Sequence, residues 1–232
     1  MDKSNIFKIG IGTWKIDPEN FNNEIEKEVA LIVGKSSKDI NIAIVNESAY
    51  MIDREKSKRW LINELSRIEE HIGGRIDFID FYMQSIEEIR IRMLNADLVY
   101  IVGGKQHIYS KLFNETNTIE LIKEVAEKRV IMGTSAGSIV LGRQIISEKF
   151  WRERYNSKLE DFEYTELGIV PFNIVPHCYR EDHKQWTKEF LERVLADNPF
   201  TVYGITDEQA IAYIDGKIKF IGGTPDIFGK KD

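Results

Sequence analysis

The sequence predicts an α/β protein in which a mostly parallel sheet carries helices on both faces. Short runs rich in β-branched residues alternate with longer segments of helical periodicity, as in chains built from β–α–β units. One of the clearest strand candidates, residues 41–46, is apolar almost throughout, which is typical of a strand buried on both faces. With 232 residues, 42% of them hydrophobic, the chain is long enough to form one domain over residues 1–232.

The first half of the chain alternates predicted strands with predicted helices. The strands are residues 6–12, 41–46, 76–82 and 97–103. The first helix follows Pro18 and repeats apolar residues at helical spacing. Further helices are predicted over residues 54–70, through Ile86, Ile89 and Met93, and over residues 118–128.

The second half of the chain changes its rhythm. A strand at residues 130–132 precedes an apolar helix at 139–145, and a strand at 172–175 precedes a helix at 182–195. Three strands then follow closely, at residues 201–205, 210–214 and 218–221. Asp215-Gly216 between the last two is a hairpin signal, so we expect antiparallel strands at the C-terminal edge of the sheet.

Composition narrows the classes of function. The formal charge of −6 gives no electrostatic reason to bind nucleic acid or an anionic membrane. No apolar run approaches the roughly 18 residues that cross a bilayer, and no signal peptide is recognisable, so we expect a cytoplasmic protein. The one cysteine, Cys178, makes neither an internal disulfide nor, by itself, a zinc site.

The sharpest chemical signal is Gly133-Thr134-Ser135-Ala136-Gly137, which fits the pattern G-x-S-x-G. It lies between a predicted strand and an apolar helix, where this pattern makes a tight turn that lifts a serine oxygen to the carboxyl edge of a sheet. The N–H of Ala136 would then face a developing oxyanion. The alternative is a glycine-rich turn without chemistry.

A nucleophilic serine needs a base, and His177 is the strongest of four candidates. It follows a predicted strand and Pro176, so it lies at a carboxyl end, where open α/β sheets bind ligands. His107 follows a glycine pair and is the alternative, whereas we expect His71 to cap a helix and His183 to be solvated.

The base needs an orienting carboxylate, and Asp207 follows the strand at 201–205 at another carboxyl end. Glu208 is the alternative, and Asp161 or Asp182 would serve if both neighbours are solvated. The chain order Ser, His, Asp differs from that of α/β-hydrolases and argues against a lipase-type enzyme.

The glycine pair Gly103-Gly104 leaves backbone N–H groups exposed at a strand end. The N–H groups of Gly104 and Lys105 are candidates for the second oxyanion donor. Gln106 and Thr134, which adjoin these groups, are candidates for substrate binding. The loop lacks the Walker spacing of a phosphate loop.

These segments resemble the serine peptidase family of peptidase E (aspartyl dipeptidase) and cyanophycinase, whose sheet is related to that of class I glutamine amidotransferases. The resemblance runs from about residue 98 to about residue 223, on residues 101–104, 133–137, 175–177 and 203–207. It implies a triad of Ser135 as nucleophile, His177 as general base and then acid, and Asp207. The N–H groups of Ala136 and of the Gly104-Lys105 turn would form the oxyanion hole.

The resemblance implies hydrolysis of small peptides, with N-terminal aspartyl dipeptides as candidate substrates, through an acyl-enzyme on Ser135. We expect no metal and no organic cofactor, a small peptide as partner, no nucleic acid or membrane, and a monomer or homodimer. Where family members carry a third glycine and an asparagine, this chain has Lys105 and Gln106. That departure favours the rival interpretation, a non-catalytic or ligand-binding member of the same fold. An amidase would need a cysteine at the position of Ser135.

Overall fold

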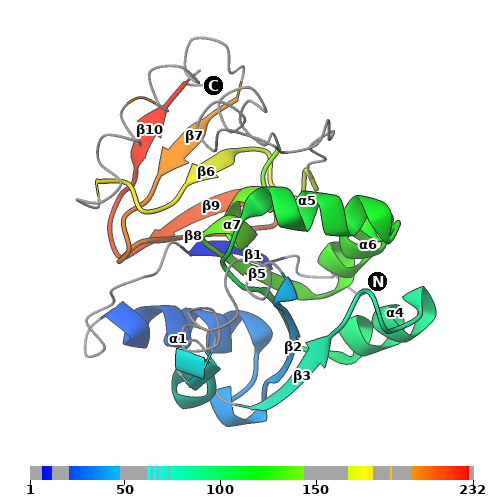
Figure 1. Cartoon of the computed structure of the whole chain (residues 1–232). Helices are drawn as coiled ribbons and strands as arrows, with labels where there is room; N and C mark the ends of the chain where they lie inside the picture. The colour runs from blue at the N-terminus through cyan, green and yellow to red at the C-terminus, as the bar shows by residue number, and fades with distance from the viewer. Residues whose placement is uncertain are drawn as a thin grey trace.

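The computed structural model describes residues 7–11, 21–47, 62–63, 65–66, 68–72, 74–143, 167–179, 189 and 200–229. Within these segments the centre is a seven-stranded sheet of order β3-β2-β4-β5-β1-β8-β9 (Figure 1). Its parallel strands are β3 (Arg75–Ile79), β2 (Asn41–Val45), β4 (Leu98–Ile101), β5 (Val130–Thr134) and β1 (Phe7–Ile11). The hairpin of β8 (Ala210–Ile214) and β9 (Lys217–Ile221) continues the sheet with antiparallel pairing.

Helices cover both faces of this sheet, which confirms the predicted fold class. One face packs on α1 (Phe21–Val33) and the π-helical turn η2 (Ile68–Ile72), near the short 3-10 helix η1 (Ser37–Asp39). The other carries α4 (Ile86–Asn95), α5 (Gln106–Glu115) and α6 (Ile119–Lys128), with α7 (Ala136–Val140) after β5.

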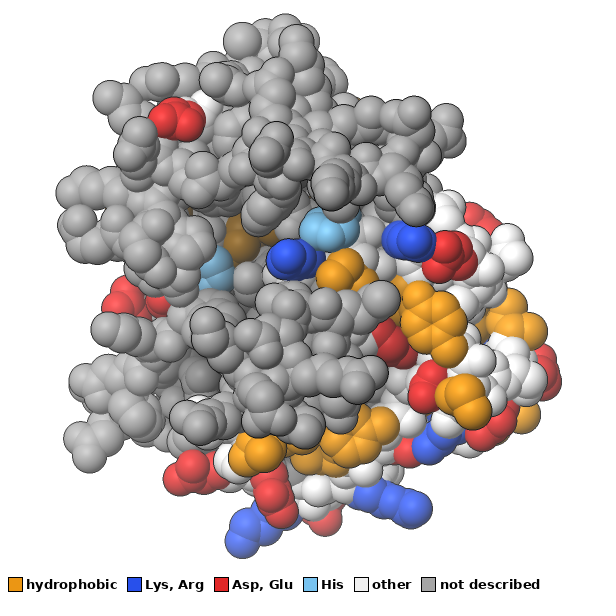
Figure 2. Space-filling model, viewed as in Figure 1, with side chains coloured by type: hydrophobic (Ala, Val, Ile, Leu, Met, Phe, Trp, Pro, Cys, Tyr) orange, Lys and Arg blue, Asp and Glu red, His pale blue; other side chains and the backbone are white. Residues whose placement is uncertain are grey.

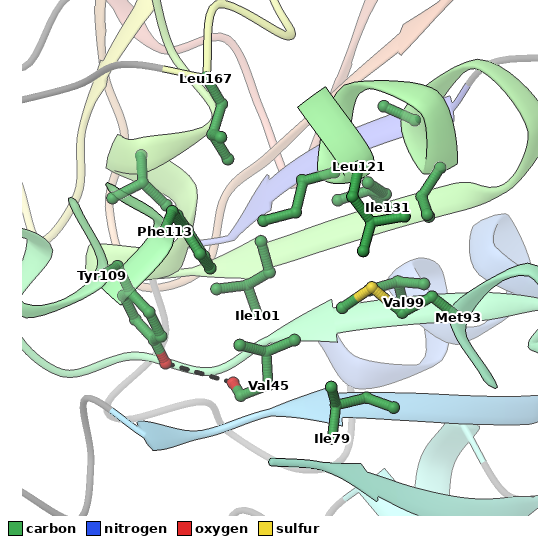
Figure 3. Packing of buried hydrophobic residues seen from close by; sticks show 14 of the residues in the cluster. Val45, Ile79, Met93, Val99, Ile101, Tyr109, Phe113, Leu121, Ile131 and Leu167 are labelled. Atoms are coloured by element: carbon green, nitrogen blue, oxygen red, sulfur yellow. Dashed lines mark hydrogen bonds between the residues drawn. The ribbon is translucent and has the colours of Figure 1, made fainter. Parts of the chain in front are cut away.

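Side-chain alternation along β2 sorts the two cores. Ile42 and Ile44 face α1, while Ala43 and Val45 face the α4–α5–α6 side. Figure 3 shows this second core, where Tyr109 of α5 reaches back to the backbone of β2. The apolar side chains of β2 therefore pack against helices on both faces of the sheet, which explains why the strand is apolar almost throughout.

Three C-terminal strands form a separate sheet of order β10-β7-β6, which the sequence analysis does not predict. β6 (Asn173–Val175) and β7 (Val202–Gly204) pair in parallel, and β10 (Asp226–Phe228) is antiparallel to β7. The strand expected at residues 201–205 cannot pair with β8, because β1 and β9 already pair with the two edges of β8.

Aromatic packing joins the second sheet to the hairpin. The ring of Phe172 meets Tyr203 edge-on at a centroid distance of 5.1 Å, and meets Tyr213 of β8 at 5.9 Å. Tyr203 in turn packs on Phe220 of β9. This small core sets how the two sheets lie against one another.

Three predicted helices lie outside the described residues in whole or in part: those at 54–70, 139–145 and 182–195. None of the described helices has the length and apolar character to span a bilayer.

Candidate active site

The turn between β5 and α7 has room only for glycine on either side of Ser135. A Cβ on Gly133 would lie 2.3 Å from the carbonyl oxygen of Gly137, and one on Gly137 would lie 2.1 Å from that of Ile101. Ser135 itself has φ 49° and ψ −116°, a strained conformation for a residue with a side chain. The G-x-S-x-G sequence is thus required sterically, and it puts Ser135 at the carboxyl end of β5.

His177 and Asp207 follow two paired strands, β6 and β7. The N–H of Ile205 donates to the carbonyl of Val175 at 3.0 Å, and the N–H of Cys178 donates to the carbonyl of Ile205 at 2.9 Å. These bonds extend the pairing beyond the strands and hold both loops in register. His177 Nδ1 lies 2.6 Å from Asp207 Oδ1, and the two side chains are buried.

The second ring nitrogen of His177 faces the serine. His177 Nε2 lies 2.9 Å from Ser135 Oγ. With Nδ1–H donated to Asp207, Nε2 is the acceptor for the serine hydroxyl proton. The structure therefore brings together the three side chains that the sequence analysis groups, from three different strand ends.

The alternative acid, Glu208, is exposed and accepts a hydrogen bond from Thr206 Oγ1 at 3.2 Å. Asp161, Asp182 and His183 lie outside the described residues, as does the side chain of His71.

The loop before α5 accommodates Lys105 at the position where family members carry a third glycine. Gly104 has φ 147°, in the region that favours glycine, whereas Lys105 has φ −122° and ψ 122°, which any residue adopts. Replacing glycine by Lys105 therefore adds no backbone strain. The N–H of Ala136 begins α7 as expected.

Two other reactive side chains lie near His177 or in this loop. Burial, reinforced by Lys105, lowers the pKa of His107 to about 4, so that this imidazole is neutral at neutral pH. Burial raises the pKa of the Cys178 thiol to about 12, with a smaller contribution from Asp226. Cys178 therefore stays a thiol rather than a nucleophilic thiolate.

The two predicted substrate-binding side chains are both buried. Thr134 accepts a hydrogen bond from the Tyr100 hydroxyl at 3.1 Å. Gln106 is 6% exposed, and within the described segments its Nε2 has no hydrogen-bond partner. Substrate binding by either residue stays a prediction. Figure 2 shows histidine and basic side chains together on one face of the molecule.

Residues 19–221 match the sequence pattern of peptidase family S51. The chain belongs to this family. It is a serine-type peptidase by class, and hence a hydrolase. The resemblance noted in the sequence is thereby confirmed at the level of the family.

Relatives and solved structures agree with this assignment. An uncharacterized peptidase of Listeria monocytogenes is 24% identical over 149 residues, which are 64% of this chain and 71% of that protein. Cyanophycinase of Synechococcus elongatus is 28% identical over 139 residues, 59% of this chain but only 42% of the cyanophycinase. A crystal structure of a putative peptidase E protein from Listeria monocytogenes superposes with a TM-score of 0.70 at 16% identity, covering 93% of this chain and 98% of that one. At that identity the likeness concerns the fold.

One acid at the same sheet edge is missed by the sequence analysis. Glu47 lies two residues after β2, and its carboxylate accepts a hydrogen bond from the N–H of Phe81 at 3.0 Å. The sequence carries a signal for it, because Glu47 follows an apolar strand within two residues, much as Asp207 follows β7 within three.

Proposed function

We propose that this peptidase hydrolyses small peptides through an acyl-enzyme on Ser135, with His177 as the base and Asp207 as its orienting carboxylate. The observation that carries the proposal is the pair of distances at one imidazole: 2.9 Å from Nε2 to Ser135 Oγ and 2.6 Å from Nδ1 to Asp207 Oδ1. This geometry supports the proposal, because a His177 that donates Nδ1–H to Asp207 has Nε2 free to accept the serine proton.

The proposed reaction has two halves. Ser135 Oγ attacks the scissile carbonyl carbon while its proton passes to Nε2 of His177, and the imidazolium then protonates the leaving amine. Water attacks the resulting ester, again with His177 as base, and releases the acid product and the free serine. No metal or organic cofactor enters these steps.

Backbone N–H groups would stabilise the oxyanion. Ala136 contributes one at the start of α7, and the Gly104-Lys105 turn contributes the other. Their support is positional, since β4 and β5 are neighbours and both groups follow the carboxyl ends of these strands. N-terminal aspartyl dipeptides are the first substrates to test, given the resemblance to peptidase E.

Labelling with a fluorophosphonate tests the nucleophile directly, because such a probe reacts only with an activated serine. We expect the wild-type protein to be labelled and Ser135→Ala to be unlabelled, with hydrolysis of a cleavable dipeptide reduced on the order of 10³-fold or more. Ser85→Ala is the matched control, since Ser85 caps α4 through its Oγ and the N–H of Glu88 at 3.2 Å. A wild-type protein that resists labelling would favour the non-catalytic interpretation instead.

A further inference from the structure

Glu47 holds a carboxylate that its surroundings satisfy only in part. Oε1 accepts the hydrogen bond from Phe81, and the backbone N–H groups of Asn46 and Glu47 also act on the carboxylate. Oε2 is nevertheless buried and has no hydrogen-bond partner among the described residues. No ion pair involves Glu47 within the described part of the chain, and the neighbour that acts on it electrostatically is another carboxylate, Asp80. Burying a carboxylate without a cation is unfavourable, so a positively charged ligand would stabilise this arrangement.

The environment of Glu47 is apolar on the α5 side. Phe81 and Tyr109 belong to the core between the sheet and α5, and the negative charge of Glu47 adds to the burial that raises the pKa of Tyr109. Burial raises the pKa of Glu47 itself to about 7, against the backbone hydrogen bond of Phe81 that lowers it. Among the described residues, the exposed Tyr82 is a second titratable group whose pKa the charge of Glu47 helps to raise. An ammonium group bound here would favour the ionised carboxylate.

Gln106 on α5 supplies a second buried atom that lacks a hydrogen-bond partner among the described residues. The atom is Nε2, and the residue is only 6% exposed. Gln106 lies three residues before Tyr109 on α5, hence on the same helix face, one turn nearer the carboxyl edge. The Tyr109 hydroxyl donates to the carbonyls of Val102 at 2.6 Å and Val45 at 3.2 Å, so this face of α5 lies over the ends of β4 and β2 (Figure 3).

Strand register relates the backbone of Glu47 to that of Ser135. Val45, Ile101 and Gly133 lie in one row across β2, β4 and β5. Glu47 and Ser135 each stand two residues beyond that row, two strand spacings or about 10 Å apart at the backbone. An extended peptide spans about 3.3–3.6 Å per residue. A cationic group near the scissile bond could therefore reach Glu47 while the scissile carbonyl lies at Ser135.

We propose that Glu47 binds an ammonium group of the peptide substrate, and that Gln106 donates a hydrogen bond to a peptide carbonyl oxygen beside it. This inference rests on the proposed function, since it places the subsite relative to Ser135. Oε2 is buried but the Glu47 residue as a whole is partly exposed, so a ligand approaches the carboxylate from the exposed part of the side chain. Its carboxylate is already stripped of much of its water, which strengthens the attraction to a cation.

Two fluorophosphonate probes of equal length test the proposal, one ending in a primary ammonium group and the other in a hydroxyl. We expect the wild-type protein to react with the ammonium probe about 10- to 100-fold faster, the range of a charge-assisted hydrogen bond. Glu47→Gln should abolish this preference, because the amide oxygen still accepts from Phe81 but the charge is gone. Glu115→Gln, which removes a carboxylate from the exposed end of α5, should keep the preference.

The outcomes separate the two proposals. Equal rates with both probes in the wild-type protein, or a preference that survives in Glu47→Gln, would overturn the ammonium site. Failure of both probes to label the wild-type protein would overturn the proposed nucleophile, and the subsite with it.

Peptides then identify the source of the ammonium group. A Glu47-dependent preference for Ala-Ala over N-acetyl-Ala-Ala assigns the site to the substrate N-terminus. A Glu47-dependent preference for N-acetyl-Lys-Ala over N-acetyl-Ala-Ala assigns it to a basic side chain. If Glu47→Gln slows all three peptides equally, Glu47 acts on the fold and the proposal is wrong.

Discussion

Two of the three grouped side chains stand on backbone with positive φ, 49° at Ser135 and 60° at His177. Such values are uncommon for residues other than glycine and persist only where the surroundings enforce them. At Ser135 the enforcement comes from the crowded glycines of the elbow, and at His177 from the backbone bond between Cys178 and Ile205. The backbone thus fixes where both side chains point before any substrate arrives.

His177 and His107 should differ sharply on substitution. His177→Ala removes the proposed proton acceptor, so we expect turnover of a cleavable dipeptide to fall on the order of 10³-fold or more. His107→Ala should change turnover by only a few-fold, because a neutral, partly buried imidazole has no assigned proton to move. Steady-state rates of the two variants decide the matter, and a larger loss in His107→Ala would mean that the base is assigned wrongly.

The neighbouring acids Asp207 and Glu208 give a similar contrast. Asp207→Asn would disturb the tautomer of His177, and we expect kcat to fall on the order of 10³–10⁴-fold with little change in KM. Glu208→Gln removes an exposed charge bonded to Thr206 and should cost less than about tenfold. The reverse order of effects would show that the orienting carboxylate is Glu208.

A site residue can be predicted from the sequence when its neighbours in the chain determine its position, and not when distant residues do. The elbow is a local steric requirement, so five consecutive residues predict it. Glu47 is different, because its carboxylate accepts a hydrogen bond from Phe81, 34 residues further along the chain. Only the folded sheet shows that this acid shares a row with Ser135.

At the level of elements, α5 is a helix that the sequence pattern does not predict. Its buried face includes Gln106 and Ser110 as well as Tyr109 and Phe113, so polar residues interrupt the apolar period. Lys105 at its N-cap makes no side-chain capping bond. In the second sheet, β6 and β7 match the strands predicted at residues 172–175 and 201–205. Their pairing with each other and with β10 is not local, so the separate sheet is not predicted.

The β5–α7 elbow should not tolerate alanine at Gly137. The new Cβ would lie 2.1 Å from the Ile101 carbonyl oxygen, so β4 and the elbow must move apart. We expect a loss of at least about 2–3 kcal/mol in the free energy of unfolding, together with loss of fluorophosphonate labelling. Denaturant unfolding measures the first effect.

Gly34→Ala is the control for that substitution. Gly34 has φ 71° but no atom within 4 Å of a new Cβ, so only the dihedral cost of about 1 kcal/mol applies. Labelling should persist in this variant. Equal destabilisation by both substitutions would contradict the steric account of the elbow.

At the level of the whole molecule, the candidate site depends on how two sheets meet. Ser135 follows the seven-stranded sheet, whereas His177 and Asp207 follow the three-stranded one. The Phe172 and Tyr203 rings pack against the β8–β9 hairpin and hold the sheets together. The 2.9 Å between Ser135 and His177 is therefore a property of this packing as well as of the two loops.

The free energy of unfolding should depend on pH because of the buried carboxylate of Glu47. Its pKa rises from 4.5 to about 7 on folding, so between these values the folded state binds more protons than the unfolded state. The free energy of unfolding therefore falls as the pH rises through this window and levels off above about pH 7, by up to about 3 kcal/mol. Glu47→Gln cannot titrate, so it should lack this part of the decline.

Denaturant unfolding of both proteins at pH 5 and pH 8 measures this difference. Relative to the wild-type protein, Glu47→Gln should gain stability between the two values, whatever its stability at either one. Glu115→Gln should follow the wild-type curve, because its carboxylate is exposed. If Glu47→Gln also follows that curve, the carboxylate does not carry the buried charge that an ammonium site needs. If it diverges as expected, the fold maintains an unfavourable charge at the carboxyl edge, which is the usual relation between stability and a binding group.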